Sequence, residues 1–353
     1  MSHVVAVMPV PAPHAYPQAE IASVIGPILV RDPTRRSLLE RLHAASGVAR
    51  RTLALPLAEY ATLRDFGTAN EAFVRVGTDL GEQAVRGALE RAGLAPSEVD
   101  FLLFTTVTGV SAPSLDALLV EPLGLRPDVR RLPSFGLGCA GGAAGLARVH
   151  DYLLGHPTHV AVLLSVELCS LTIQHGDDST ANLVASGLFG DGAAAAVLVG
   201  SDHPFAPGSG PRVVDAASRL YPGTEDSLGW AVGRSGLRIV LSAGLPDLVA
   251  SRLGDDVAAF LETHDLKTRD IGAWIVHAGG PRILEAVRDA LDLEPDALGR
   301  SRASLAQAGN LSSTSVLHVL ASHMDADPEP GTWGVVIAFG PGVGAELVLL
   351  RWG

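Results

Sequence analysis

GLGCAGGAAGL, residues 136–146, is the stretch that bears most directly on the fold, and it has two interpretations. Gly136, Gly138 and Gly141 form the pattern G-x-G-x-x-G, which in dinucleotide-binding proteins lets a loop wrap a pyrophosphate. The same stretch places Cys139, one of two cysteines in the chain, where a helix is expected to begin. The flanking residues decide between a phosphate-binding loop and a turn that positions a nucleophilic thiol.

A dinucleotide loop should follow a strand directly and have an acidic residue about 20 positions further on, which binds the ribose hydroxyls. The preceding residues 130–135 read RRLPSF; with Pro133 inside, they are not expected to form a strand. Residues 160–164 read VAVLL and contain no carboxylate. We therefore reject the dinucleotide interpretation.

The thiol interpretation draws on the segment that follows. Residues 140–154 are predicted to form a helix with Leu146, Val149 and Leu153 on one face and small residues in its first turns. The positive end of a helix dipole favours the thiolate, so we expect a lowered pKa for Cys139. For an arbitrary cysteine the commoner alternative is an inert buried thiol, and that alternative stays open at this point.

A thiol nucleophile needs partners that are distant in sequence and close in the fold. His277 ends a predicted strand, residues 273–277, and opens the turn HAGGP before a predicted helix at 282–291. Asn310 lies in GNLSSTS, a turn that leads into a predicted helix at 316–324. These two residues are the candidate partners of Cys139.

The other histidines lack such a setting. His150 and His156 lie on or just after one predicted helix without metal-ligand spacing, and His318 lies on a helix face. We interpret them as solvated or core histidines. Nothing in the sequence resembles a zinc or carboxylate-cluster site, so no metal is expected.

Composition limits the protein class. The 353 residues, 47% hydrophobic and 18% charged, are typical of a close-packed α/β enzyme. A net charge of −12 disfavours nucleic acid and anionic membranes as partners. The N-terminal residues resemble no signal peptide, and no apolar run reaches the length of a membrane span. With two cysteines, too few for a disulfide framework, we expect a cytoplasmic protein without stable membrane insertion.

Two pairs of similar segments suggest an internal duplication. A predicted helix and strand at 80–95 and 101–107 resemble a second pair at 253–263 and 273–277. A Gly-x-Gly turn followed by an apolar strand occurs at 190–199 and again at 340–349. We expect two halves, 1–205 with the cysteine and 206–353 with the histidine and asparagine, joined by the Pro/Gly-rich residues 203–211.

With Cys139, His277 and Asn310 in this order, the chain resembles the type III polyketide synthases, the chalcone-synthase family of thiolase-fold condensing enzymes. The similarity runs from about residue 4 to 352. It is carried by five motifs, GLGCAGG at 136–142, LFGDG at 188–192, HAGGP at 277–281, GNLSS at 309–313 and FGPG at 339–342. The resemblance implies an α/β thiolase fold with a duplicated five-layered α-β-α-β-α core.

The resemblance also implies roles. Cys139 matches the family's acyl-accepting nucleophile, and His277 and Asn310 match the pair that binds the thioester carbonyl and supports decarboxylation of malonyl-CoA. Phe189 matches one of two gatekeeper aromatics, and Ile239 replaces the second. Arg41 and Arg282 are candidate contacts to CoA phosphate, although a solvated arginine is as good an interpretation of Arg41. Positions matching the wall of the reaction cavity are Val107, Ala112, Cys169, Thr172, Trp230, Ile239 and Ser312.

Several functional expectations follow from this resemblance. The substrates are an acyl-CoA starter and malonyl-CoA extenders, with no further cofactor, and the protein is a homodimer in which Ala112 reaches the neighbouring cavity. Cys169 is expected to be a lining thiol, and Trp230 to fill part of the cavity. The apolar lining favours an aliphatic starter and an alkylresorcinol or alkylpyrone product. The alternatives are a ketoacyl-acyl-carrier-protein synthase III, which performs one condensation, and a non-catalytic scaffold.

Overall fold

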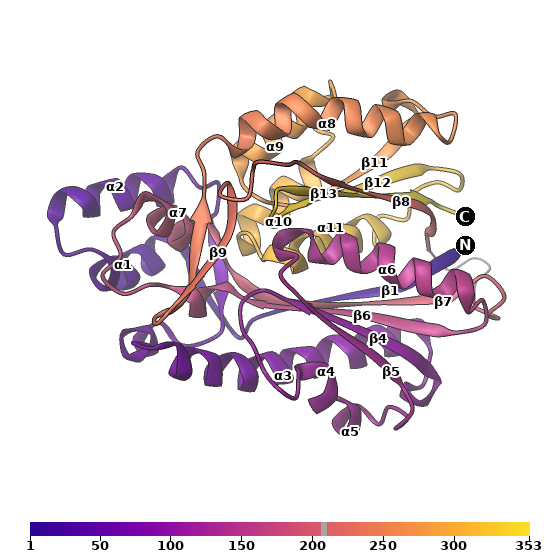
Figure 1. Cartoon of the computed structure of the whole chain (residues 1–353), viewed down its shortest axis with the longest axis horizontal. Helices are drawn as coiled ribbons and strands as arrows, with labels where there is room; N and C mark the ends of the chain where they lie inside the picture. The colour runs from indigo at the N-terminus through magenta and orange to yellow at the C-terminus, as the bar shows by residue number, and fades with distance from the viewer. Residues whose placement is uncertain (206–209) are drawn as a thin grey trace.

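The structure is a computed structural model that describes residues 1–205 and 210–353. Its centre is a mixed sheet in the order β11-β12-β13-β8-β1-β7-β6-β4-β5. Five strands come from the first half of the chain: β1 (Ser2–Pro11), β4 (Val99–Thr106), β5 (Arg130–Phe135), β6 (Val160–Leu168) and β7 (Asp191–Gly200). Four come from the second half: β8 (Arg212–Leu220), β11 (Ile271–Val276), β12 (Trp333–Gly340) and β13 (Gly344–Arg351). Among the described residues, the strand pairing that joins the two sets is the short β1–β8 ladder, and the two sets form two layers (Figure 1).

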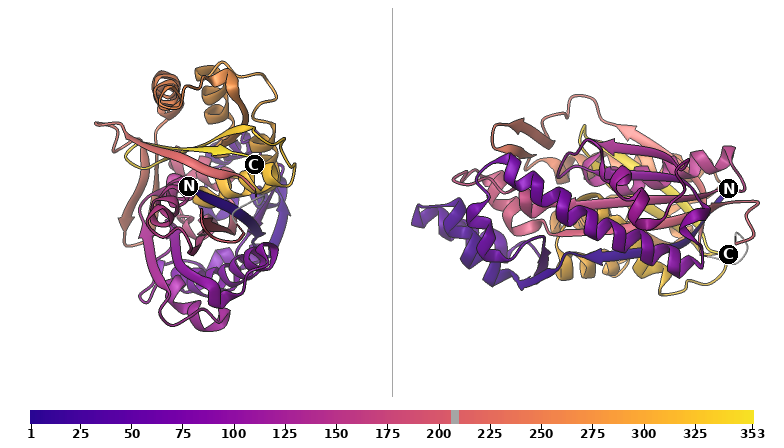
Figure 2. Two further views of the ribbon diagram at one scale, coloured as in Figure 1. Left: turned by 90° about the vertical axis from the view of Figure 1, so that its right-hand side faces the viewer. Right: turned by 90° about the horizontal axis from the view of Figure 1, so that it is seen from below.

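The helices complete five layers, which Figure 1 shows from top to bottom. Helices α8 (Leu245–Glu262) and α9 (Pro281–Ala290) cover the second-half strands. Helices α6 (Gly141–Gly155) and α11 (Ser315–Met324) lie between the two strand layers, and α3 (Phe66–Ala92) covers the first-half strands from below. Figure 2 shows α3 from below, running along the sheet. The expected duplicated α-β-α-β-α thiolase fold is confirmed.

The duplication is visible in the topology. In each half an outer helix leads to a parallel strand pair, β4–β6 or β11–β12, and an antiparallel strand, β7 or β13, follows. The predicted boundary between residues 205 and 206 stays a prediction, since residues 206–209 of the proposed linker lie outside the described part of the chain.

The middle layer is held by close packing of small residues. Leu146, Val149 and Leu153 of α6 are fully buried, as the periodicity predicts, and each contributes about 1.5–3 kcal/mol of hydrophobic stabilisation. At Gly142 a side chain would overlap the main-chain oxygen of Ser313, and at Gly145 it would overlap Leu163. Glycine therefore allows α6 to approach both the strands and the η6 turn (Ser312–Thr314).

One strand prediction is wrong. Residues 130–135 form β5, which pairs in parallel with β4 at the edge of the sheet. Proline is tolerated in an edge strand because its missing N–H can face the unpaired side, where no hydrogen bond to a neighbouring strand is lost. The strand leads to the Cys139 turn, so one of the two arguments against a dinucleotide loop does not hold, while the missing carboxylate still does.

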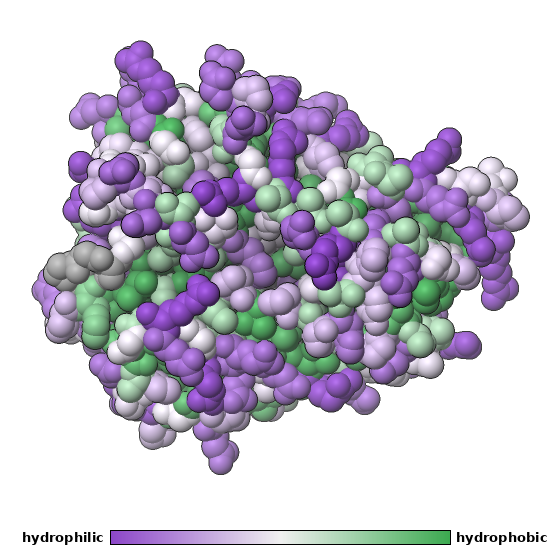
Figure 3. Space-filling model, turned by 180° about the vertical axis from the view of Figure 1, so that it is seen from behind, coloured by the Kyte–Doolittle hydropathy of each residue, from purple (hydrophilic) through white to green (hydrophobic). Residues whose placement is uncertain are grey.

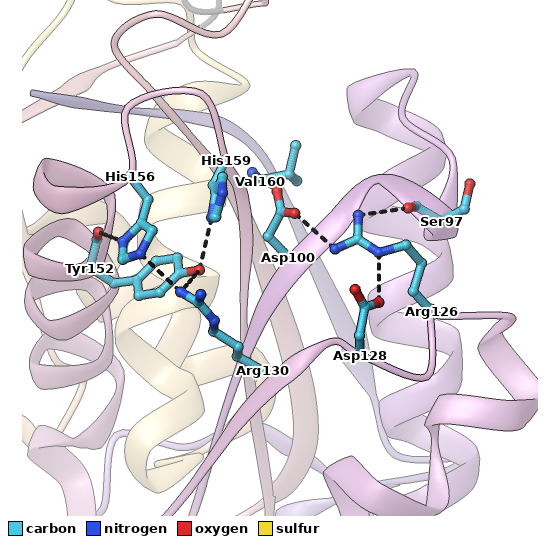
Figure 4. Close-up of polar contacts among 9 residues, drawn as sticks. All are labelled: Ser97, Asp100, Arg126, Asp128, Arg130, Tyr152, His156, His159 and Val160. Carbon is cyan, nitrogen blue, oxygen red and sulfur yellow. Dashed lines mark hydrogen bonds and ion pairs between the residues drawn. The ribbon is translucent and has the colours of Figure 1, made fainter.

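A cluster of polar side chains anchors the start of β5 (Figure 4). Arg126 donates to Asp100 at 3.0 Å, and the other carboxylate oxygen of Asp100 accepts from the main-chain N–H of Val160 at 2.9 Å. Arg130 donates to Nε2 of His156 at 2.9 Å, with Tyr152 stacked on the same imidazole. These tertiary contacts join β5 to β4, β6 and α6, and no local pattern in the sequence announces them.

Most predicted helices begin or end elsewhere than expected. The helix expected at 80–95 is the end of α3, which starts at Phe66, and the one expected at 253–263 is the end of α8. The helix after the cysteine begins with a 3-10 turn, η3 (Gly138–Ala140), before α6. The side chain of Asp65 accepts from the N–H of Thr68 and marks the start of α3, whereas the N-cap residues of α6 and α8, Ala140 and Gly244, make no such hydrogen bond.

The remaining elements form the end of the molecule away from the termini (Figures 1 and 2). The longer ones are α1 (Gln18–Leu29), α2 (Pro33–Ala44), α7 (Thr180–Leu188), α10 (Gly299–Ala308), and the hairpin β9 (Leu228–Gly233) with β10 (Gly236–Leu241). The shorter ones include β2 (His14–Pro17), β3 (Arg50–Leu53), η1 (Leu57–Thr62) and η4 (Cys169–Thr172). This end carries most of the candidate cavity residues.

The short helices α4 (Leu115–Leu118) and α5 (Val120–Leu123) precede β5, and the 3-10 turns η2 (Pro96–Glu98) and η5 (Thr268–Asp270) precede β4 and β11.

On the rear face hydrophilic side chains follow the outline and apolar ones gather in patches between them (Figure 3). No helix among the described residues is long and apolar enough to cross a membrane.

Candidate active site

Cys139 lies in the 3-10 turn η3, at the junction between β5 and α6. Gly136 and Gly138 have positive φ angles of 99° and 52°, which favour glycine. A side chain at position 138 would also overlap the ring of Pro341, and one at 141 would contact Thr105 and Ser313. The glycines of the G-x-G-x-x-G pattern therefore allow this turn and its close packing against β12, β4 and η6.

The Cys139 thiol is nearly buried and hydrogen-bonded. Its Sγ donates to Oγ of Ser312 at 3.6 Å, and the amide of Asn310 also contacts the sulfur. Burial raises the pKa of Cys139 to about 12. The expected lowering of this pKa by the helix dipole is therefore wrong for this structure, because desolvation of the thiolate is the larger effect.

His277 follows β11 directly, as the sequence predicts. Its main-chain N–H donates to the oxygen of Ile337 at 2.8 Å, which fixes it beside β12. The imidazole is buried against Gly279, and among the described residues its Nδ1 has no hydrogen-bond partner. Burial lowers the pKa of His277 to about 4, so the ring is neutral and able to accept a proton.

Asn310 lies between the cysteine and the histidine turn. Its Nδ2 donates to the main-chain oxygen of Gly279 at 3.2 Å, and its Oδ1 accepts from the N–H of Ser312 at 2.8 Å. Gly279 N–H donates to the main-chain oxygen of His277 at 2.8 Å, and the Asn310 amide also hydrogen-bonds Cys139, so Asn310 links the cysteine to the turn that begins at His277.

Sequence reasoning missed Glu167, a fully buried carboxylate near the end of β6. Burial raises the pKa of Glu167 to about 7. Its oxygens accept hydrogen bonds from Ser312, Ser313, Thr106, Thr108 and the main-chain N–H of Val107. The available signal was a single carboxylate in the strand VAVLLSVEL, in which Ser165 is the other polar residue and an unpaired charge would be costly.

Five of the predicted cavity residues line one narrow space of about 20 Å³, namely Cys169, Thr172, Phe189, Trp230 and Ile239. Val107 and Ser312 lie instead beside Glu167. Burial raises the pKa of the Cys169 thiol well above its ordinary value, which suits a lining residue. Ala112 is exposed in the loop between β4 and α4 and does not line this space.

The two candidate arginines are exposed. Arg41 is in the last turn of α2 and Arg282 in the first turn of α9. Gly47, just beyond α2, abuts Pro281 at the start of α9, so the two segments are neighbours.

The remaining predicted histidines have structural contacts. His150 is hydrogen-bonded to Ser2 and His318 to the main-chain oxygen of Ala193. Within residues 1–205 and 210–353, no group of three or more His, Cys, Asp and Glu side chains is arranged to hold a metal ion.

Comparison with known proteins covers almost the whole chain. Residues 38–203 match the family "Chalcone and stilbene synthases, N-terminal domain", and residues 212–352 match the corresponding C-terminal domain. A 1,3,6,8-tetrahydroxynaphthalene synthase of Streptomyces peucetius is 54% identical over 96% of this chain and 90% of its own length. An α-pyrone synthesis polyketide synthase-like protein of Mycobacterium tuberculosis is 32% identical over 91% of this chain and 84% of its own.

Solved structures agree. The crystal structure of 1,3,6,8-tetrahydroxynaphthalene synthase from Streptomyces coelicolor, a bacterial type III polyketide synthase, superimposes with a TM-score of 0.93 at 30% identity and covers 99% of both chains.

Proposed function

Because this chain belongs to the chalcone and stilbene synthase family and is a type III polyketide synthase, we propose that it converts malonyl-CoA alone into 1,3,6,8-tetrahydroxynaphthalene. The observation that carries this proposal is the 54% identity to a synthase of that compound over 96% of the chain. An acyltransferase of this class is what the sequence predicts. The ketoacyl-acyl-carrier-protein synthase III alternative is not favoured, since both family matches are to chalcone and stilbene synthases.

The proposed product differs from the expected alkylresorcinol or alkylpyrone. That expectation came from Ile239 and the apolar lining. In the structure Trp230 and Phe189 line, together with Cys169, a narrow space of about 20 Å³, so two aromatic side chains narrow this wall although Ile239 replaces one gatekeeper. The α-pyrone relative is also much less similar, at 32% identity.

The named compound fits an all-malonyl origin. The ten carbon atoms of naphthalene correspond to five two-carbon units, and hydroxyls at 1, 3, 6 and 8 follow the alternation of a polyketide. Five malonyl-CoA molecules would release five CO₂, five CoA and one water to give C₁₀H₈O₄. No oxidant or reductant is needed.

In the proposed mechanism Cys139 is the nucleophile. The neutral imidazole of His277 accepts the thiol proton as sulfur attacks the starter thioester, and the proton then goes to the sulfur of the departing CoA, which leaves as its thiol; the acyl-enzyme divides one transfer into two easier steps. Malonyl-CoA then loses CO₂, and its electrons form an enolate whose oxygen accepts hydrogen bonds from His277 and Asn310. Donors at such an oxygen typically contribute about 3–4 kcal/mol each.

The resulting carbanion attacks the acyl group on Cys139, and CoA carries the longer chain until it is reloaded and cyclised. We assign Arg41 and Arg282 to the CoA phosphates, because both are exposed on neighbouring segments. We assign Phe189 and Ile239 to the gate of the cavity, and Trp230, Thr172, Cys169, Val107 and Ser312 to its wall. The chain's own residues need no further cofactor for these steps.

The edge strand β5 supports a homodimer. Its outer edge is not paired with another described strand. Leu132 and Phe135 on this strand are 47% and 52% exposed, respectively. An unpaired apolar edge favours pairing with another chain. We propose that two copies meet here, with Ala112 near the contact, and that the protein works in the cytoplasm, where its two buried cysteines stay reduced.

The test is to incubate the purified protein with isotopically labelled malonyl-CoA alone and, separately, with a series of acyl-CoA starters. We expect a product of formula C₁₀H₈O₄ from malonyl-CoA alone, with all its carbon labelled, and none from Cys139→Ala. An enzyme that is inactive with malonyl-CoA alone and forms alkylated rings with long acyl-CoAs would overturn the proposal in favour of the aliphatic-starter function. A single condensation on a carrier protein would contradict both.

A further inference from the structure

The C-terminus of α7 ends inside the protein, next to Phe189. The last carbonyl groups of a helix have no partner within the helix, and water usually satisfies them. Here the oxygens of Ser186, Gly187 and Leu188 accept hydrogen bonds from Arg51, Gln18 and the N–H of Asn310, at 2.7, 2.6 and 2.8 Å. Buried protein donors therefore replace water at this helix end.

Arg51 supplies the central part of this cap. It is 2% exposed, and its guanidinium donates to three oxygens of neutral groups. Nη1 donates to the main-chain oxygen of Phe189, Nη2 to that of Ser186, and Nε to Oε1 of Gln18 at 3.0 Å. A positive charge at a helix C-terminus is favourable because it faces the negative end of the dipole.

The same side chain touches the segment that carries Asn310. At Gly309, with a φ of 75°, an added side chain would contact Cγ and Cδ of Arg51 at 3.1 and 3.0 Å. The next residue, Asn310, pairs with the Phe189 segment, since Gly190 N–H donates to the Asn310 oxygen at 3.0 Å. Arg51 thus lies where a segment from each half of the chain meets.

We propose that Arg51 is a positioning residue that holds Phe189 and Asn310 in register across the two halves of the chain. This inference rests on the roles proposed above for Phe189 and Asn310. Arg51 acts through the main chain. Its guanidinium group fixes the carbonyl groups of Ser186 and Phe189, on either side of the α7 terminus, and its methylene groups limit the position of residue 309. A lysine would keep the charge and lose the planar geometry that spans several acceptors.

The test compares Arg51→Lys and Arg51→Met with the wild type, using malonyl-CoA and normalising to the concentration of alkylatable Cys139. We expect kcat/KM to fall about tenfold in Arg51→Lys, the scale of one lost hydrogen bond, and further in Arg51→Met. We also expect a larger proportion of truncated products relative to the wild-type product, because a displaced Phe189 lets intermediates leave early. Each variant is also assayed with malonyl-CoA plus the acyl-CoA starters, and the comparison uses whichever substrates the wild type converts, so it does not depend on which product the wild type makes.

The matched control is Arg35→Met. Arg35 donates to the oxygen of Asp178 just before the other end of α7, at the surface, so its loss should leave kcat/KM and the product ratio unchanged. In the Phe189→Ala background, Arg51→Lys should produce no additional change in the product ratio. If Arg51→Met does not fold, Arg51→Lys decides. The proposal would be overturned by a folded Arg51→Lys variant that keeps the wild-type KM and the wild-type product ratio. This holds even if the kcat of that variant is lower.

Discussion

The hydroxyl of Ser312 donates a hydrogen bond of 3.2 Å to the carboxylate of Glu167. With its proton committed to Glu167, the Ser312 oxygen accepts from the thiol of Cys139. A buried carboxylate behind the nucleophile therefore favours the thiol over the thiolate.

Replacing Glu167 by Gln should increase the reactivity of Cys139. The substitution removes a negative charge that raises the pKa of the thiol. We expect iodoacetamide to alkylate Cys139 severalfold faster in Glu167→Gln than in the wild type at pH 8, as measured by mass spectrometry. The matched control is Glu346→Gln, a half-buried carboxylate that also accepts from a serine, at 2.7 Å, and lies on β13. An unchanged or slower rate in Glu167→Gln would argue against this coupling.

Glu167 should also make stability depend on pH. Its pKa in the folded protein, about 7, exceeds its ordinary value of 4.5. Between these values the unfolded chain releases the proton and the folded chain keeps it, so stability falls as pH rises through this window and then levels off. We expect the free energy of unfolding, relative to Glu167→Gln, to drop by on the order of 3 kcal/mol from pH 4.5 to pH 7. Urea denaturation across this range measures it; a constant difference would contradict the assignment.

The reactivity of Cys139 should rise steadily with pH. In the structure the thiol pKa is about 12 and the pKa of His277 is about 4, so the resting pair is neutral. Alkylation in the absence of substrate should therefore keep rising between pH 6 and 9, by up to about tenfold per pH unit, because only the thiolate reacts and ionisation of Glu167 near pH 7 partly opposes its formation. Cys139→Ala corrects for labelling at Cys169. A rate that levels off near pH 6 or 7 would reveal a thiolate–imidazolium pair instead.

His277→Ala and Asn310→Ala should each slow decarboxylation of malonyl-CoA by about 10²–10³-fold, the usual effect of losing one donor to a developing oxyanion. Release of labelled CO₂ measures the step separately from condensation. His14→Gln, a partly exposed histidine on β2, serves as the control and should retain wild-type decarboxylation. If either active-site variant decarboxylates at the wild-type rate, that residue has no role in stabilising the enolate.

Phe135→Glu should convert a dimer into a monomer. The residue is 52% exposed on the edge strand β5, and paired negative charges at a two-fold contact repel. Sedimentation velocity at several concentrations distinguishes the two states. Val232→Glu, at an even more exposed apolar position on β9, should leave the oligomeric state unchanged. Monomeric wild-type protein at micromolar concentration would contradict the proposed interface.

The sequence determined the catalytic candidates locally, because a glycine-rich turn before a helix, a histidine at a strand end and an asparagine in a turn each carry their own signal. The enzyme class and the thiolase fold came from the resemblance of five motifs to a known family. Buried strands such as β6 and β7 are likewise evident from continuous apolar runs. Element boundaries were less certain, and β5 was missed because an edge strand with an internal proline is stabilised by Asp100, Arg126 and Arg130 rather than by its own pattern.

Only the tertiary structure decided the electrostatics of the site. The sign of the pKa shift at Cys139 depends on burial and on Glu167, which lies 28 positions later in the chain and reaches it through Ser312. The capping of α7 by Arg51 likewise joins residues more than 130 positions apart. Desolvation and hydrogen bonding are properties of neighbours in space, so a sequence names these groups without showing which of them meet.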